Sequence, residues 1–403
     1  MYRYGQAEID AVARVIRSGQ WFRYGDSAKG HLGETKLFEQ ELAAYMGTKH
    51  ACFMSHGTTS LMCCYAGLGM GPGDEVIIPG FTWVASALAP MNLGIVPVIV
   101  DVDESLTISP EAIEKAITPR TKAINPIHMA GLACDMDAIT DIAKRKGLYI
   151  VEDACQCDGG LWHDGRKLGT IGDTGAYSFN YYKVISCGEG GAFVCQDEEV
   201  FERGVIYHDS GCNFFSGQPK LPMFGGLIVR GNELMAAMMR VQLQRLPGIV
   251  ADLQQRRADL ELRLQTALPK TVRTGLRYGG ARTGTGAVAT LMCQDEASAR
   301  RLMERYRATP AAALCAAWIP IDSGRHVYAN WESVMQRRGS YHPDLNAFNL
   351  PQNAGSTATY SPTMLPRTLE LLKRSVILPI NPDWTTAELD TLAQGFTGAA
   401  TGL

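Results

Sequence analysis

A lysine between an apolar segment and a glycine turn is the group in this chain best suited to chemistry. Lys183 follows residues 176–179, which are typical of a short strand, and precedes the glycine-rich residues 188–191. Apolar flanks strip water from an ammonium group and lower its pKa, and a neutral lysine amine forms a Schiff base with an aldehyde. Ser178 lies five residues upstream and could hold an anion at the same site. An isolated lysine in such a turn is usually a surface residue, so the assignment depends on neighbouring motifs.

Three other segments carry residues that could bind a ligand. Thr58 and Thr59 precede a helical run at residues 61–66, and the free N–H groups and dipole of a helix start form a natural phosphate cradle. Asp153 follows a predicted strand at residues 148–151, and parallel α/β sheets bind ligands at the carboxyl ends of their strands. Trp83 offers an aromatic face in an uncharged stretch. Each also has an ordinary explanation, namely a helix start, a cap after a strand, or a core indole.

In chain order, these segments resemble the DegT/DnrJ/EryC1/StrS family of sugar aminotransferases, from about Gly33 to Leu246. The motifs that carry the resemblance are Ser55-His-Gly-Thr-Thr59, Phe81-Thr-Trp83, Asp153-Ala-Cys-Gln156, Ser178 to Lys183, and Gly188-Glu-Gly-Gly191. The resemblance implies the type I aminotransferase fold, which binds pyridoxal 5'-phosphate (PLP). In that α/β fold a large domain with a mainly parallel sheet is followed by a smaller C-terminal α/β domain.

The resemblance also implies a role for each matching residue. Lys183 would be the catalytic residue that holds PLP as a Schiff base and then moves protons. Asp153 would pair with the pyridine nitrogen, Trp83 would stack on the ring, and Gln156 would contact the ring hydroxyl or pack on the ring. The expected cofactor-binding residues are Thr58, Thr59, Trp83, Asp153, Gln156, Ser178, Lys183 and Asn232. His128 is interpreted as a packing histidine near the site, and Glu152 as a neighbour of the site.

One position departs from the family pattern. The family usually carries an asparagine that reaches the cofactor phosphate of the neighbouring subunit, and Ile228 stands there in this chain. Either another residue, such as Asn232, replaces that contact, or the cofactor is held less tightly. Because the family's active site lies between two subunits, and residues around 223–229 are apolar, we expect an obligate homodimer.

The lysine distinguishes among reactions of the family. The branch that removes a sugar hydroxyl has histidine in place of Lys183, so we expect amino transfer from glutamate or glutamine to a ketone or aldehyde of a sugar, sugar acid or cyclitol. A branch that makes aminohydroxybenzoate is an alternative, because residues 127–139 look similar to it, and a non-catalytic regulator is another. Within the family, similarity to the branch that aminates C8 of an eight-carbon keto-deoxy sugar acid predicts an acidic substrate. The candidate substrate residues are Arg23, Tyr24, Arg230, Trp318 and His326.

Composition limits the other function classes. The chain has 403 residues, 46% of them hydrophobic, and a formal net charge of −3, so nucleic acid and anionic membranes are poor partners. The eleven cysteines are scattered without metal-ligand spacing, which predicts buried thiols and no metal site. The uncharged stretch 76–100 is interrupted by Pro79, Gly80 and Pro90, so it predicts strands and a helix of a core. The first five residues carry no apolar signal region, and we expect a cytoplasmic protein.

The order of the elements predicts the architecture. Strands at 75–78, 96–100, 123–127 and 148–151 alternate with helices, which favours a parallel sheet covered on both faces. Ser109 and Pro110 should open a helix to residue 117, and Gly147 should end a helix at 137–146. A helix at 232–246 should end at Pro247-Gly248, and a second helix at 251–268 should lead into the smaller part. The predicted domains are residues 1–250 and 251–403.

Overall fold

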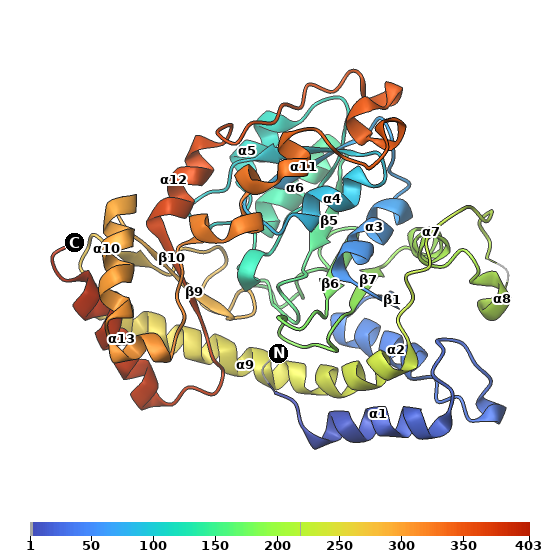
Figure 1. Cartoon of the computed structure of the whole chain (residues 1–403), viewed down its shortest axis with the longest axis horizontal. Helices are drawn as coiled ribbons and strands as arrows, with labels where there is room; N and C mark the ends of the chain where they lie inside the picture. Colours follow the sequence, from blue (N-terminus) through green and yellow to red (C-terminus); the bar gives the residue numbers. More distant parts are fainter. Residues whose placement is uncertain (1–2, 218) are drawn as a thin grey trace.

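The computed structural model describes residues 3–217 and 219–403, which surround two sheets (Figure 1). Within these residues the larger sheet has seven strands in the order β1-β7-β6-β5-β4-β2-β3. The strands are β1 His50–Met54, β2 Glu75–Pro79, β3 Val96–Val100, β4 Thr121–Ile124, β5 Tyr149–Asp153, β6 Thr174–Ser178 and β7 Gly191–Cys195. β7 runs antiparallel to β1 and β6, and the other neighbouring pairs are parallel. The predicted mainly parallel sheet is confirmed.

Successive strand residues pack into two different cores, so both faces of this sheet are covered. Ile77 and Ile150 lie in one core, whereas Val76 and Val151 lie in the other. This follows from the two-residue period of a strand, and it explains why these strands are apolar throughout. Helices that line the first core are α2 Glu34–Met46, α5 Pro110–Ala116, α6 Met136–Lys146 and α9 Glu233–Ala267. Those that line the second are α3 Gly57–Gly67, α4 Ala85–Met91, α7 Glu198–His208 and α12 Pro366–Arg374.

Two predicted helix ends are confirmed in detail. The Ser109 side chain caps α5 by accepting a hydrogen bond from the backbone N–H of Ala112, and Pro110 occupies the first helical position. Gly147 follows α6 with φ 66°, in the left-handed region where glycine meets no steric penalty. The alternation of strands and helices therefore begins and ends close to where local sequence signals place it.

The predicted break at Pro247-Gly248 is wrong, because α9 continues through both residues as one helix. A proline inside a helix costs about 3 kcal/mol. Pro247 and Gly248 face solvent, however, while Leu246, Ile249 and neighbouring residues of α9 are buried in the first core. Each such apolar side chain contributes about 1.5–3 kcal/mol on burial, so tertiary packing outweighs the local penalty.

The second sheet is antiparallel and has three strands, among the described residues, in the order β10-β9-β8. Its strands and the remaining α-helices are β8 Arg273–Thr274, β9 Val288–Met292, β10 Ser375–Pro379, α1 Gln6–Ser18, α8 Asn213–Ser216, α10 Glu296–Arg307, α11 Glu332–Met335 and α13 Thr386–Ala400. Figure 1 shows α9 running from the large sheet to the helices around this second sheet. Tyr328 and Trp331 return to the core of the large sheet. The division at residue 250 stays a prediction, and α9 passes through it unbroken.

Other sequence expectations concern cysteines and membranes. Every cysteine in the described part of the chain is a free thiol; Cys155 and Cys187 are partly buried and the others are buried, as predicted. None of the helices in that part has the length and apolar character needed to cross a bilayer. Met1 and Tyr2 of the N-terminal segment considered above lie outside the described residues.

A buried ion-and-hydrogen-bond network holds the end of β5 against the following loop. The Glu152 carboxylate accepts hydrogen bonds from the backbone N–H groups of Gly169, at 2.8 Å, and of Gly172, at 2.6 Å. It also contacts His128 Nε2 at 3.0 Å, and both side chains are fully buried. Because His128 Nδ1 accepts a hydrogen bond from the Cys134 N–H, Nε2 carries the ring hydrogen and donates a hydrogen bond to Glu152. The interpretation of His128 as a packing histidine is confirmed.

Glu152→Gln should destabilise the fold, because the carboxylate accepts from Ile171 as well as from Gly169, Gly172 and His128. An amide offers these four donors one acceptor oxygen and turns two donor hydrogens toward them. We expect the free energy of unfolding to fall by about 2–4 kcal/mol, measured by urea denaturation. Glu111→Gln, at an exposed helix position, is the control and should leave the urea midpoint close to that of the wild type. Equal stabilities of the two variants would contradict the network.

Candidate active site

The four motif segments lie at one edge of the large sheet. Asp153 ends β5 and Ser178 ends β6, and these strands are parallel with Asp153 opposite Ala176. β1 runs in the same direction as β6, because each is antiparallel to β7, and the residues that follow it, 55–59, reach the same edge. The loop after β2 carries Trp83. The prediction that Asp153 stands at the carboxyl ends of parallel strands is confirmed.

The start of α3 is packed directly against Ser178. A Cβ atom at Gly57 would lie 2.7 Å from Ser178 Cβ and 3.0 Å from Cys155 Sγ, so only glycine fits there. His56 precedes the helix without a side-chain cap, and Thr59 Oγ1 donates to the His56 carbonyl at 2.8 Å. The N–H groups of the first turn therefore keep their hydrogen-bonding capacity for an anion, with the Ser178 hydroxyl beside them.

Asp153 is held by hydrogen bonds that fix the orientation of its carboxylate. It is buried, and its Oδ2 accepts from Ser86 Oγ at 2.8 Å while Oδ1 accepts from the Cys155 N–H at 3.1 Å. The Ser86 hydroxyl is also 2.9 Å from Thr82 Oγ1, which links the carboxylate to the loop that carries Trp83. Sequence reasoning missed Ser86, although its spacing of four residues from Thr82 at a helix start was a usable signal.

Lys183 lies in a tight turn braced by a carboxylate. Its N–H donates to the Asn180 carbonyl at 2.9 Å, and Asn180 Nδ2 contacts both oxygens of Glu189, at 3.1 and 3.2 Å. Glu189 also lies 3.8 Å from His56 Nε2, just before α3. Lys183 is partly buried, and its charge acts on the Cys155 thiol, whose pKa burial raises well above its usual range. The lysine turn thus sits between the α3 start and the loop after Asp153.

A segment from the C-terminal part completes this region. The Thr82 N–H donates to the His326 carbonyl at 2.9 Å, and the Tyr328 N–H donates to the Gly80 carbonyl at 3.0 Å. This pairing sets the His326 ring 5.1 Å from the Trp83 ring, with 52° between their planes. Burial lowers the pKa of His326, and the charge of Lys183 lowers it further, so the imidazole is neutral at pH 7. Trp83 remains 45% exposed, with its indole free to stack on a planar ring.

Two other predicted residues have identified backbone partners. Gln156 Oε1 accepts from the Ala130 N–H at 3.0 Å, which leaves its NH₂ group as the end able to face a ligand. Trp318 is partly buried and exchanges backbone hydrogen bonds with Ile377 of β10, at 3.0 and 2.9 Å. Trp318 therefore belongs to the second sheet, and its role toward a substrate stays a prediction.

The predicted residues Arg23, Tyr24 and Arg230 form a separate polar cluster with internal partners. Arg23 pairs with Glu39 at 2.8 Å, and Asp209 accepts from the Tyr24 hydroxyl at 2.9 Å and from Arg230 at 3.0 Å. Burial would raise the pKa of Asp209, but the hydrogen bonds from Tyr24, Gly211 and Arg230 lower it on balance. These contacts favour a structural role for the two arginines, and their substrate role stays a prediction.

The cluster nevertheless adjoins the anion cradle. The backbones of Arg230 and Met54 form an isolated antiparallel β-bridge, and the Ser55 N–H donates to the Val229 carbonyl at 2.8 Å. Asn232 lies two residues further on and caps α9, accepting from the Met235 N–H at 3.0 Å. Its amide oxygen is therefore engaged within this chain, and a cofactor contact by Asn232 stays a prediction.

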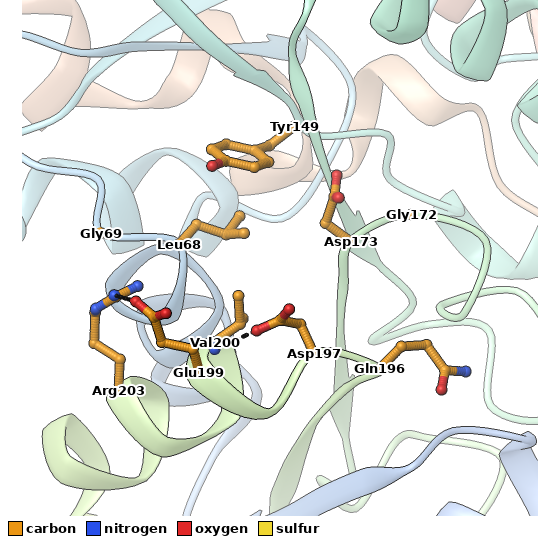
Figure 2. Close-up of a pocket in the computed structure, with 10 residues that line it drawn as sticks. All are labelled: Leu68, Gly69, Tyr149, Gly172, Asp173, Gln196, Asp197, Glu199, Val200 and Arg203. Atoms are coloured by element: carbon orange, nitrogen blue, oxygen red, sulfur yellow. Dashed lines mark hydrogen bonds and ion pairs between the residues drawn. The ribbon is translucent and has the colours of Figure 1, made fainter. Parts of the chain in front are cut away.

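A cavity of about 710 Å³ opens at the opposite edge of the sheet (Figure 2). Tyr149, at the start of β5, and Asp173, just before β6, contribute to its wall, together with Asp197, Glu199 and Arg203. Figure 2 shows Glu199 directed at Arg203 and Asp197 directed at the backbone of Val200. None of the predicted site residues lines this cavity, so its volume has no bearing on the site at the carboxyl edge.

A covered, mainly parallel sheet with a lysine, an aspartate and an open helix start at its carboxyl edge defines the type I fold of PLP-dependent enzymes. A model of the DegT/DnrJ/EryC1/StrS aminotransferase family matches residues 3–330. The chain belongs to that family. Solved structures support the fold: 3-amino-5-hydroxybenzoic acid synthase superimposes with a TM-score of 0.78 and 28% identity, covering 100% of this chain and 98% of that one. DesV of S. venezuelae, in complex with a ketimine intermediate, superimposes with a TM-score of 0.74 and 29% identity. The match covers 98% of this chain and 95% of that one.

Curated relatives match part of the chain. The 3-amino-5-hydroxybenzoate synthase of Amycolatopsis mediterranei is 37% identical over 62% of this chain and 63% of its own length. The L-glutamine:2-deoxy-scyllo-inosose aminotransferase of Streptoalloteichus tenebrarius is 42% identical over 48% of this chain and 46% of its own. The dTDP-3-amino-3,4,6-trideoxy-alpha-D-glucose transaminase of Streptomyces venezuelae is 41% identical over 60% of this chain and 61% of its own length. The matched part is thus less than two thirds of each relative.

Gly57→Ala should weaken the binding of PLP, because the added methyl group pushes the α3 start away from Ser178. Overpacking of this kind costs about 1–3 kcal/mol, so we expect about fivefold to 150-fold weaker binding in an absorbance titration with PLP. Gly248→Ala is the control, because nothing lies within 4 Å of a Cβ there and alanine favours the helix. Unchanged affinity in Gly57→Ala would contradict the placement of the cradle.

Proposed function

We propose that this chain is a PLP-dependent aminotransferase that moves an amino group from glutamate or glutamine to a keto or aldehyde group of a sugar, sugar acid or cyclitol. One observation carries the proposal: Lys183, Asp153 and the uncapped start of α3 meet at one edge of the sheet. Family membership supports it, because that family is described as aminotransferases.

The residues present fit PLP. The α3 start, Thr58 and Ser178 would hold the phosphate, since the glycine at 57 leaves N–H groups facing the space beside the Ser178 hydroxyl. Asp153 would face the pyridine nitrogen with a carboxylate fixed by Ser86 and the Cys155 N–H. Trp83 would cover one face of the ring. When bound, PLP supplies an electron sink for a carbanion formed next to the amino nitrogen.

The chain's own groups supply binding and proton transfer. Lys183 would hold the cofactor covalently through Nζ, and after its release the same Nζ would carry a proton between two carbon atoms of the reactants. His326 lies against Trp83, and its neutral imidazole would offer a hydrogen bond to a sugar hydroxyl of the substrate. A sugar acid with eight carbons remains one of the predicted acceptors.

A synthase of aminohydroxybenzoate is the second candidate function. The relative and the solved structure that carry that name match this chain at 37% and 28% identity. The name of another relative specifies L-glutamine and a cyclitol ketone, and this supports amino transfer with glutamine as a donor. The products separate the two functions, because an aromatic amino acid absorbs in the near ultraviolet and an amino sugar does not.

Lys183→Ala should abolish covalent attachment of PLP, because no amine remains to bond to the aldehyde. We expect the visible absorption band of the lysine-bound cofactor to disappear and turnover to fall by at least about a thousandfold. Lys122→Ala, at an exposed lysine, should keep both. In the wild type, glutamate and glutamine are added separately and the conversion of the bound cofactor to its amine form is followed by absorbance. A Lys183→Ala protein with the wild-type band and rate would contradict the proposal.

We also propose that the protein functions as a homodimer with sites shared between subunits. Leu227 and Ile228 are 41% and 66% exposed, close to the anion cradle, although both are apolar. Trp21 is 51% exposed on a neighbouring segment, where its carbonyl accepts from the Glu233 N–H. Exposed apolar side chains gathered in neighbouring segments are typical of a subunit interface.

Ile228→Glu should shift the protein toward monomers, because a charge at the interface would lose water on association. Light scattering at low micromolar concentration, in the presence of PLP, measures the mass. Leu262→Glu is the matched control, since Leu262 is 63% exposed on α9. A wild-type protein that is monomeric and fully active would contradict the shared-site model.

A further inference from the structure

Asp153 stands at the end of a chain of three buried polar side chains. The Ser86 hydroxyl donates to Asp153 Oδ2 at 2.8 Å, and Ser86 Oγ lies 2.9 Å from Thr82 Oγ1. Thr82 and Ser86 are each 1% exposed and Asp153 is 4% exposed, so bulk water does not compete for these bonds. Thr82 precedes α4 and Ser86 lies in its first turn, whereas Asp153 ends β5. The chain therefore joins two segments of the site.

The number of available hydrogens fixes the direction of this chain. A carboxylate only accepts hydrogen bonds, so the single hydroxyl hydrogen of Ser86 is committed to Asp153. The bond between the two hydroxyl groups must then use the hydrogen of Thr82, with Ser86 Oγ as its acceptor. The Trp83 carbonyl is another acceptor near Thr82 Oγ1, but at 3.5 Å it is the weaker partner. The chain thus runs from Thr82 through Ser86 to Asp153.

Backbone hydrogen bonds hold both hydroxyl-bearing residues in place. The Thr82 N–H donates to the His326 carbonyl at 2.9 Å, and the Ser86 N–H donates to the Trp83 carbonyl at 3.1 Å. Asp153 Oδ1 accepts from a backbone N–H of its own loop at 3.1 Å. One carboxylate oxygen is thus held by the loop after β5, and the other by the loop that carries the indole. Each oxygen keeps a lone pair for a ligand.

We propose that Thr82 is a positioning residue for Asp153 and that it acts through Ser86. Its hydroxyl polarises the Ser86 hydroxyl and strengthens the bond to Oδ2, because hydrogen bonds in a chain reinforce one another where the dielectric is low. The carboxylate is then held in one orientation before a ring nitrogen arrives. The proposal rests on the role proposed above for Asp153 and deepens it, since the loop that supplies the stacking indole also orients the acid.

A similar arrangement elsewhere in the chain provides a matched control. Ser105 Oγ donates to Asp103 Oδ1 at 2.6 Å and lies 2.7 Å from Thr107 Oγ1. Ser105 and Thr107 are also buried. These three residues lie between β3 and α5, where Asp103 accepts from the Tyr278 hydroxyl at 2.5 Å. Substitutions there remove the same kind of buried bond, and none of these residues belongs to the proposed cofactor site.

A double-variant cycle on PLP binding tests the chain of hydrogen bonds. Thr82→Val, Ser86→Ala and the double variant are titrated with PLP, and binding is followed by absorbance. Ser86→Ala removes a hydrogen bond to a charged group, so we expect binding to weaken by about tenfold or more. Thr82→Val should weaken binding by about threefold to tenfold in the wild-type background. In the Ser86→Ala background it should add less than about twofold, because no serine hydroxyl remains to be polarised.

A PLP analogue whose ring nitrogen is replaced by carbon separates positioning of the acid from a general loss of structure. Because 1-deazapyridoxal 5'-phosphate presents no ring nitrogen to Asp153, Thr82→Val and Ser86→Ala should each change its affinity by less than about twofold. Thr82→Ser keeps the hydroxyl and should bind PLP within about twofold of the wild type. Ser105→Ala and Thr107→Val should lower the urea midpoint but leave PLP affinity within about twofold.

Equal losses of affinity for PLP and for the analogue would overturn the proposal, and so would additive effects of Thr82→Val and Ser86→Ala. Urea unfolding of the cofactor-free variants shows whether each is folded. If Ser86→Ala does not fold, the comparison of Thr82→Val with Thr82→Ser on both cofactors decides the question, and equal affinities of these two variants for PLP would refute the role of the hydroxyl. Failure of the proposed function would appear differently, as a wild-type protein that does not bind PLP through Lys183.

Discussion

The register of β5 beside β6 is the constraint on which the rest of the site depends. Glu152 and Asp153 are consecutive residues of one strand, so their side chains point to opposite faces of the sheet. Glu152 faces His128 and the N–H groups of residues 169–172, whereas Asp153 faces Ser86 at the open edge. A shift by one residue would turn each carboxylate to the other face of the sheet, away from the groups that hold it.

The helix start at Gly57 is fixed by the same strands. Its place against Ser178 requires that β1 and β6 run in the same direction with β7 between them. The absence of a side chain at Gly57 then brings backbone donors within reach of an anion, and the Ser178 hydroxyl adds one more. Local sequence explains the helix start at Gly57 and the strand end at Ser178 separately, and the order of the strands in the sheet brings the two together.

Contacts between distant segments determine which residues border the site. Backbone pairing of residues 80–82 with 326–328 brings His326 to Trp83, and the bridge between Met54 and Arg230 brings residues 228–232 to the anion cradle. The same kind of tertiary effect keeps α9 continuous at Pro247, where burial on both sides outweighs the local preference for a break. Arg23 and Arg230 form ion pairs with Glu39 and Asp209 within the chain, and no local sequence pattern predicts these pairs.

The sequence by itself determined the alternating elements, several of their ends, and the motif residues Lys183, Asp153, Ser178 and Thr58, because strand period, helix caps and glycine turns are local properties. It also identified His128 as a packing residue, although not the Glu152 partner that explains it. Only the tertiary structure decided the partners of Asp153 and the meeting of Trp83 with His326. These depend on which segments pack against one another, and packing energy is shared among residues far apart in the chain.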